Sequence, residues 1–179
     1  EKDSRELTKY LHMIGDLERI SDHAVNIVDA ADEISNKKIT FSDKATAELK
    51  VVSEAVTEIL NITVDSFKTN NVLLAAEVEP LEEVIDDMVL LLKNRHTARL
   101  CQGICSVKSG LIFMDMLTYF ERAADQCSSI AMLMLGKNNE EIMKNHHLYL
   151  QELHAYGDEM YNAEQENRKE QYLIPLENI

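Results

Sequence analysis

A glutamate followed directly by an arginine, with an aspartate four residues after the glutamate, occurs twice in this chain of 179 residues, and the two copies are 103 residues apart. The first pair is Glu18 and Asp22, and the second pair is Glu121 and Asp125. On a helix, residues at this spacing lie on one face, and two like charges there destabilise an isolated helix by about 0.2–0.5 kcal/mol. Cations or basic side chains from outside the helix are therefore expected to offset the repulsion.

Two interpretations of these carboxylates remain open on spacing alone. Glu82 and Asp86 form a third pair of the same kind, and carboxylates from neighbouring helices can hold a divalent ion between them. Oxygen-rich clusters favour Mg²⁺, Ca²⁺ or Mn²⁺, whereas iron and zinc favour an added histidine. Alternatively, Arg19, Arg122 and nearby lysines neutralise the carboxylates on a solvated salt-bridge face.

The composition predicts a helical protein that binds no nucleic acid. Five glycines and two prolines leave long uninterrupted stretches, and a net charge of −14 repels phosphate backbones. The chain has no E-x-x-H, no H-E-x-x-H and no glycine-rich phosphate loop. A metal-dependent enzyme would need an open coordination position and a placed acid or base. Since the sequence indicates neither, we expect a protein that is not an enzyme.

Residues that interrupt helices divide the chain into five predicted helices, over residues 5–35, 43–68, 72–100, 109–135 and 139–169. Ser42 is expected to cap the second helix, and Pro80 to kink the third or to split off its first turn. Turns of a few residues make consecutive helices antiparallel. The predicted fold is therefore an all-α, antiparallel up-and-down helix bundle.

An internal repeat divides the predicted bundle into units. A shift of 103 residues aligns Ile14 with Leu117 and Ile27 with Ile130, so the first and fourth helices are equivalent. Residues 39–136 then form a complete three-helix unit, and residues 1–38 form the last helix of a truncated first unit. Residues 137–179 form an acidic C-terminal helix and tail, packing on the bundle or extending from it. No apolar run reaches the roughly 18 residues needed to cross a bilayer, so we expect a soluble piece of a longer protein.

The residues around the repeated pairs resemble a known family. The segments ERISDHAVNI and ERAADQCSSI are similar to the E(D)xxxD signature of the PhoU family. The segment RHTARLCQGICSVKSGLIFMDMLTYFERAAD, residues 95–125, resembles the PhoU-like cytoplasmic tail of bacterial sodium/phosphate cotransporters. The resemblance covers roughly residues 3–136.

The resemblance implies a pair of three-helix bundles that regulates phosphate uptake and binds divalent or trivalent metal ions, such as iron, zinc or magnesium. Carried over by position, the implied metal ligands are Glu18, Asp22, Glu82, Asp86, Glu121 and Asp125. The expected function is a regulatory domain of a sodium-dependent phosphate transporter, at the cytoplasmic face of the membrane. Its expected partners are the membrane-spanning part of the same polypeptide and a second copy of the chain. The alternative is a free-standing PhoU-type metal-binding regulator of phosphate uptake and signalling.

Overall fold

A computed structural model describes residues 2–136 and 146–179 of the chain, and these residues contain helices and no strand. The all-α prediction is therefore confirmed for this part of the chain. The elements are α1 (Lys2–Asn36), α2 (Asp43–Thr69), α3 (Val72–Ala75), α4 (Val78–Cys101), α5 (Val107–Leu135), α7 (His146–Tyr156), α8 (Glu159–Arg168), the π-helical turn η1 (Lys169–Leu173) and α9 (Ile174–Glu177).

Local capping residues set most of the helix ends. Ser42 caps α2, as predicted, and its side chain accepts a hydrogen bond from the backbone N–H of Ala45 at 3.2 Å. The predicted third helix is split into α3 and α4, with Pro80 in the first turn of α4, where its missing N–H costs no hydrogen bond. Helix α5 begins at Val107, two residues earlier than predicted, because Ser106 acts as its N-cap.

The prediction of one continuous helix over residues 139–169 was wrong. Residues 139–145 lie outside the described part of the chain, and the remainder is interrupted at Gly157 and Asp158. The Asp158 side chain accepts a hydrogen bond from the backbone N–H of Tyr161 at 2.8 Å, and this cap starts α8 in a new direction. The polar composition of the segment concealed this second helix start.

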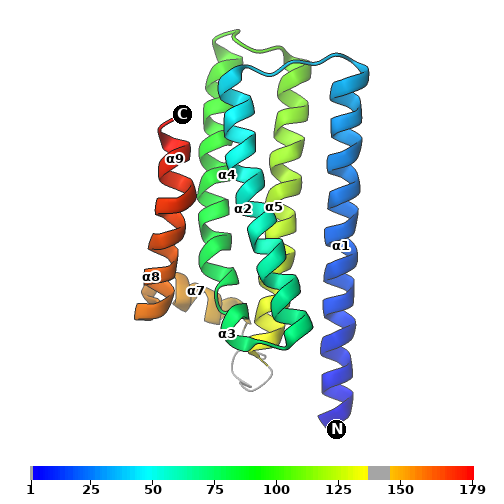
Figure 1. Cartoon of the computed structure of the whole chain (residues 1–179), viewed down its shortest axis with the longest axis vertical. Coiled ribbons are helices and arrows are strands. Elements are labelled where there is room, and N and C mark those ends of the chain that lie inside the picture. Colours follow the sequence, from blue (N-terminus) through cyan, green and yellow to red (C-terminus); the bar gives the residue numbers. More distant parts are fainter. Residues whose placement is uncertain (1, 137–145) are drawn as a thin grey trace.

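Helix α4 runs antiparallel to α2 and α5, and the three helices enclose the core (Figure 1). Val52, Val56 and Ile59 of α2 point inward and are at most 4% exposed. The core continues on α4 and α5 through Leu81, Ile85, Met88, Leu92, Phe113, Leu117, Ala124 and Ile130. Long apolar faces at helical spacing thus determine which sides of the three helices meet.

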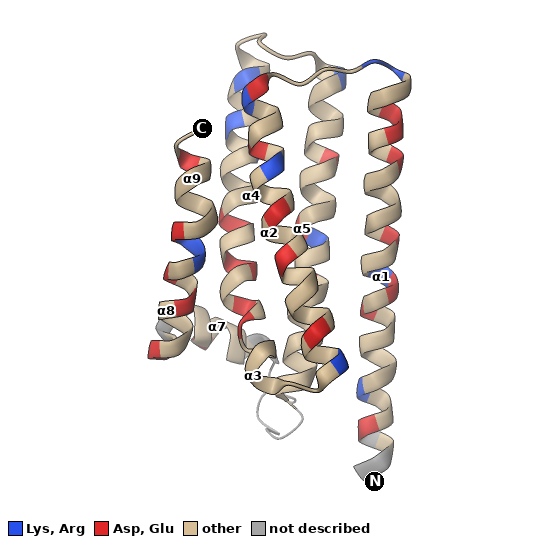
Figure 2. Ribbon diagram, in the orientation of Figure 1, with Lys and Arg blue, Asp and Glu red and all other residues tan. Residues whose placement is uncertain are grey.

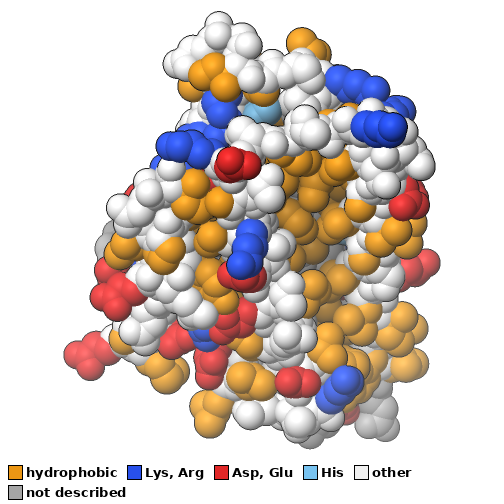
Figure 3. All heavy atoms as spheres, turned by 45° about the horizontal axis from the view of Figure 1, so that its top comes forward, with side chains coloured by type: hydrophobic (Ala, Val, Ile, Leu, Met, Phe, Trp, Pro, Cys, Tyr) orange, Lys and Arg blue, Asp and Glu red, His pale blue; other side chains and the backbone are white. Residues whose placement is uncertain are grey.

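Helix α1 packs against α5 and lies apart from α2 and α4 (Figure 1). Its buried face carries Met13 and Asp16. Other large apolar residues of α1 lie on the opposite face, where Leu7, Leu11, Ile14, Val25 and Val28 are 56–61% exposed. Hydrophobic side chains also line the hollow between α1, on the right of the molecule, and α2 (Figure 3). A large apolar face of α1 is therefore left uncovered.

Charged side chains are unevenly distributed along the bundle (Figure 2). Acidic residues gather on the lower half of α4 and on α8, whereas lysines and arginines lie at the upper ends of α4 and α5 and in the α1–α2 connection. The acidic half contains a cavity, described below.

The C-terminal helices are attached to α2 and α4 through Arg168, which is only 8% exposed. Its guanidinium forms ion pairs with Glu58 of α2, Glu164 of α8 and Glu77 between α3 and α4. The hydroxyl of Tyr172 donates to the same Glu58 carboxylate. This network therefore fixes the position of α8 and η1 on the bundle.

Replacing Arg168 by alanine is expected to lower the free energy of unfolding by about 1–3 kcal/mol and to expose α8 to proteolysis, because partly buried carboxylates lose their cation. Chemical denaturation and limited proteolysis measure the two effects. Lys50→Ala is the control, since the Lys50–Glu54 pair is 3.9 Å long and exposed. Equal behaviour of the two variants would contradict an anchoring role for Arg168.

Candidate metal centre

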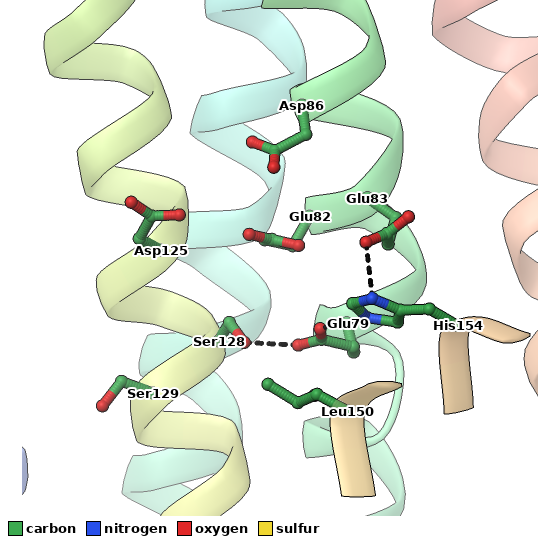
Figure 4. Close-up of a pocket in the computed structure, with 9 residues that line it drawn as sticks. All are labelled: Glu79, Glu82, Glu83, Asp86, Asp125, Ser128, Ser129, Leu150 and His154. Atoms are coloured by element: carbon green, nitrogen blue, oxygen red, sulfur yellow. Dashed lines mark hydrogen bonds and ion pairs between the residues drawn. The ribbon is translucent and has the colours of Figure 1, made fainter. Parts of the chain in front are cut away.

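Three carboxylates meet where α4 and α5 lie side by side (Figure 4). Glu82 and Asp86 are one turn apart on α4, and Asp125 faces them from α5. Each of the three offers an oxygen atom that lies within 4.8 Å of the oxygens of the other two. Glu82 is buried, Asp86 is half-buried and Asp125 is exposed, so the group reaches from the bundle interior to its surface.

The electrostatics of this group disfavour three negative charges. Burial, followed by repulsion from Glu79, raises the pKa of Glu82 from 4.5 to about 10. Burial, followed by repulsion from Asp125, raises the pKa of Asp86 from 3.8 to about 6. Burial also raises the pKa of Asp125. Within the described residues, no lysine or arginine forms an ion pair with any of these three carboxylates.

His154 of α7 lies beside this group and contacts two further glutamates of α4 (Figure 4). Its Nε2 is 2.7 Å from Glu79 and its Nδ1 is 2.8 Å from Glu83. The hydrogen bond to Glu79 raises the pKa of His154. The hydroxyl of Ser128 donates to Glu79 as well. Glu79 and Glu83 therefore have protein partners, whereas the three central carboxylates face one another.

These groups line one cavity of about 240 Å³. Its lining residues are Glu79, Glu82, Glu83, Asp86, Asp125, Ser128, Ser129, Leu150 and His154. A set of converging carboxylate oxygens, without a basic partner among the residues that the structure describes, fits a hard divalent cation, which would remove their mutual repulsion. The nearby imidazole would suit iron or zinc once it is released from its glutamates.

The structure brings together three of the six predicted ligands. Glu121 lies one turn from Asp125 but forms an ion pair with Lys93 at 2.6 Å. Glu18 and Asp22 are exposed on α1, and no other described helix brings carboxylates to them. The second pair therefore contributes to a cluster, whereas the first pair does not.

The salt-bridge interpretation predicted that Arg19 neutralises Glu18 and Asp22. In the structure, Arg19 pairs with a different acidic residue, Asp16. Its guanidinium is 3.0 Å from Asp16, and Asp16 also accepts a hydrogen bond from Ser129 at 2.7 Å. Asp16 and Ser129 join α1 to α5 across the interface. Asp16 is 5% exposed, which its position among charged neighbours in the sequence did not indicate.

His154 was also missed by sequence reasoning, because its partners lie about 70 residues away in the chain and no ligand spacing marks it.

Among the described residues, no helix is both long enough and apolar enough to cross a membrane.

Comparisons with known proteins match most of this bundle. The family model described as "PhoU domain" matches residues 1–31 and 49–134. A phosphate-specific transport system accessory protein, PhoU homolog 1 of Thermotoga maritima, is 27% identical over 150 residues. That alignment covers 80% of this chain and 62% of the relative, so the chain spans less than two thirds of the relative's length. No solved structure matches the chain.

Proposed function

Because the chain belongs to the PhoU family, we propose that it is a non-catalytic regulatory domain of a sodium-dependent phosphate transporter, at the cytoplasmic face of the membrane. The observation that carries this proposal is the family match in two segments that contain all three acidic pairs. The resemblance of residues 95–125 to cotransporter tails supports the transporter over a free-standing regulator.

The alternative is a separate PhoU-type regulator that acts on phosphate uptake from solution. It is favoured by the relative from Thermotoga maritima, whose name describes an accessory protein of a phosphate-specific transport system. In both cases we propose that the protein also binds a metal ion. We assign the cation to Glu82, Asp86 and Asp125, because these oxygens converge and no lysine or arginine in the described part of the chain forms an ion pair with them.

The uncovered face of α1 supports the proposal that residues 1–38 are the last helix of a first three-helix unit. Ile14 is 56% exposed, whereas Leu117, its equivalent in α5, is fully buried under α2 and α4. Val28 is 59% exposed, and its equivalent Ala131 is fully buried. By the repeat, two further helices of the same polypeptide would cover α1 as α2 and α4 cover α5. Such helices would also bring carboxylates to Glu18 and Asp22.

The transporter proposal is tested by locating the full-length protein in its native cells. A tagged copy is expected in the membrane fraction and to remain there after an alkaline carbonate wash. Removal of residues 43–135 from the chromosomal gene is expected to change how uptake of radiolabelled phosphate responds to phosphate supply.

Asp125→Asn in the full-length protein serves as the matched variant, because it alters the acidic group without removing a helix. A tagged protein found entirely in the supernatant, together with unchanged sodium-dependent phosphate uptake in the deletion strain, would favour the free-standing regulator instead.

A further inference from the structure

The acidic cavity between α4 and α5 already contains a cationic group from the chain itself, the imidazole of His154 (Figure 4). Both ring nitrogens face carboxylates, with Nε2 2.7 Å from Glu79 and Nδ1 2.8 Å from Glu83. A ring that donates a hydrogen bond from both nitrogens carries a positive charge. His154 therefore serves as a counter-ion inside the cavity.

One imidazolium neutralises only part of the negative charge that lines this cavity. The lining includes five carboxylates, those of Glu79, Glu82, Glu83, Asp86 and Asp125. The Oδ1 atom of Asp86 is buried and has no hydrogen-bond partner among the described residues. A divalent ion brings twice the charge of the ring and takes about six or more oxygen ligands. The cavity therefore favours such an ion over its own imidazolium.

Glu79 and Glu83 connect the ring to the three central carboxylates. Glu79 is 2% exposed and lies three residues before Glu82 on α4. After burial, repulsion from Glu79 is the largest cause of the raised pKa of Glu82, so the two carboxylates interact across the cavity. A cation at the centre would repel the imidazolium and attract the two carboxylates that hold it. The ring and the cation therefore compete for the same oxygens.

Helix α7, which carries His154, is attached to the bundle with little apolar burial. None of the side chains that the structure describes on α7 is buried, and Leu148 is 55% exposed. The His154 ring also stacks on Tyr161 of α8, with 6.4 Å between the ring centroids. Helix α8 is anchored independently through Arg168. Since an element with few buried contacts detaches at low cost, α7 can leave the bundle while α8 stays in place.

From these contacts we infer that His154 is a built-in competitor for the metal centre, and that a divalent cation displaces it and thereby releases α7 from the bundle. The inference rests on the cation site proposed above and gives metal binding a consequence at the protein surface. Residues 146–156 lie beyond the segments that match the PhoU family model, which end at residue 134. The coupling therefore belongs to the C-terminal segment of this chain.

Hydrogen exchange of the full chain, with and without saturating Mn²⁺, measures the release of α7 directly. Mn²⁺ is expected to speed exchange of the amides of residues 146–156 roughly tenfold, because the docked state of α7 is disfavoured. The amides of residues 159–168 are expected to stay protected, because Arg168 still anchors α8. Asp125→Asn removes a ligand of the cation and is expected to abolish the change.

The affinity for Mn²⁺ gives a second measurement, in which a competitor and a ligand have opposite signs. His154→Ala removes the competitor, so calorimetry is expected to show binding roughly tenfold tighter than in the wild type. If His154 were itself a metal ligand, the same substitution would weaken binding. His12→Ala is the control, because His12 is exposed on α1 and is expected to leave the affinity unchanged.

The two measurements distinguish failure of this inference from failure of the metal centre. Weaker Mn²⁺ binding in His154→Ala, or binding to the wild type with unchanged exchange over residues 146–156, would overturn the inference and leave the metal centre standing. The absence of Mn²⁺ binding in both the wild type and His154→Ala would overturn the metal centre as well.

Discussion

In the presence of Mn²⁺ at about one hundred times its Kd, the thermal unfolding midpoint of the wild-type chain is expected to rise by about 5–10 °C. The cation binds the folded state, where Glu82, Asp86 and Asp125 converge, and has no comparable site in the unfolded chain. Asp125→Asn removes one charged ligand and is expected to abolish most of this rise. Differential scanning calorimetry with and without the metal measures both values.

The pH dependence of the metal-free protein follows from the same group. In the folded state the pKa of Glu82 is about 10, against a reference of 4.5, so the folded chain binds the proton more tightly than the unfolded chain. The contribution of Glu82 to stability is therefore largest below pH 4.5 and falls as the pH rises from there towards 10. A cation displaces the proton, so metal affinity is expected to increase over the same interval.

Glu82→Gln removes both the titratable carboxyl group and a metal ligand, and these two losses change the unfolding temperature in opposite directions. At pH 8 without metal, the variant is expected to unfold at a higher temperature than the wild type, and with metal at a lower temperature. Glu18→Gln is the control, since Glu18 is exposed on α1 and is expected to change neither value. An equal loss of the metal effect in Glu18→Gln and Asp125→Asn would contradict the assigned site.

Leu117→Ala is expected to lower the free energy of unfolding by about 2–5 kcal/mol, because it leaves a cavity under α2 and α4. Ile14→Ala, at the equivalent position of α1, is expected to change it by no more than about 0.5 kcal/mol, because Ile14 is 56% exposed. Urea unfolding followed by circular dichroism measures both. The two substitutions occupy the same place in the repeat and remove side chains of similar size, so the difference in burial accounts for the expected contrast.

The same pair of variants also tests the proposed first unit. In a longer polypeptide that supplies two helices to α1, Ile14→Ala is expected to become as costly as Leu117→Ala. An unchanged, small effect in the longer protein would show that the apolar face of α1 stays uncovered there.

The sequence predicted the bundle well because helices are local structures. The periodic apolar residues of α2, the cap at Ser42 and the break near Pro80 act within a few residues of chain. The continuous last helix was the main error, because Asp158 starts a new helix inside a segment of uniformly polar character.

The candidate site was predictable only in part. Glu82, Asp86 and Asp125 could be selected because each belongs to a Glu-x-x-x-Asp pair and the family resemblance marks those pairs. Glu121 looks equivalent in sequence, yet Lys93 reaches it from α4. His154 carries no signal, since its contacts with Glu79 and Glu83 form between helices far apart in the chain.

The sequence by itself therefore determined the helices up to residue 135, apart from the exact split between α3 and α4, and it indicated the repeat and the family. Spacing along one helix is enough to place two carboxylates on one face. Only the tertiary structure decided which pair meets a third carboxylate, because that depends on the helix packed opposite. Asp125 and Asp22 occupy the same position in the repeat. Asp125 faces α4 and joins a cluster of three carboxylates, whereas Asp22 belongs to no such cluster among the described residues.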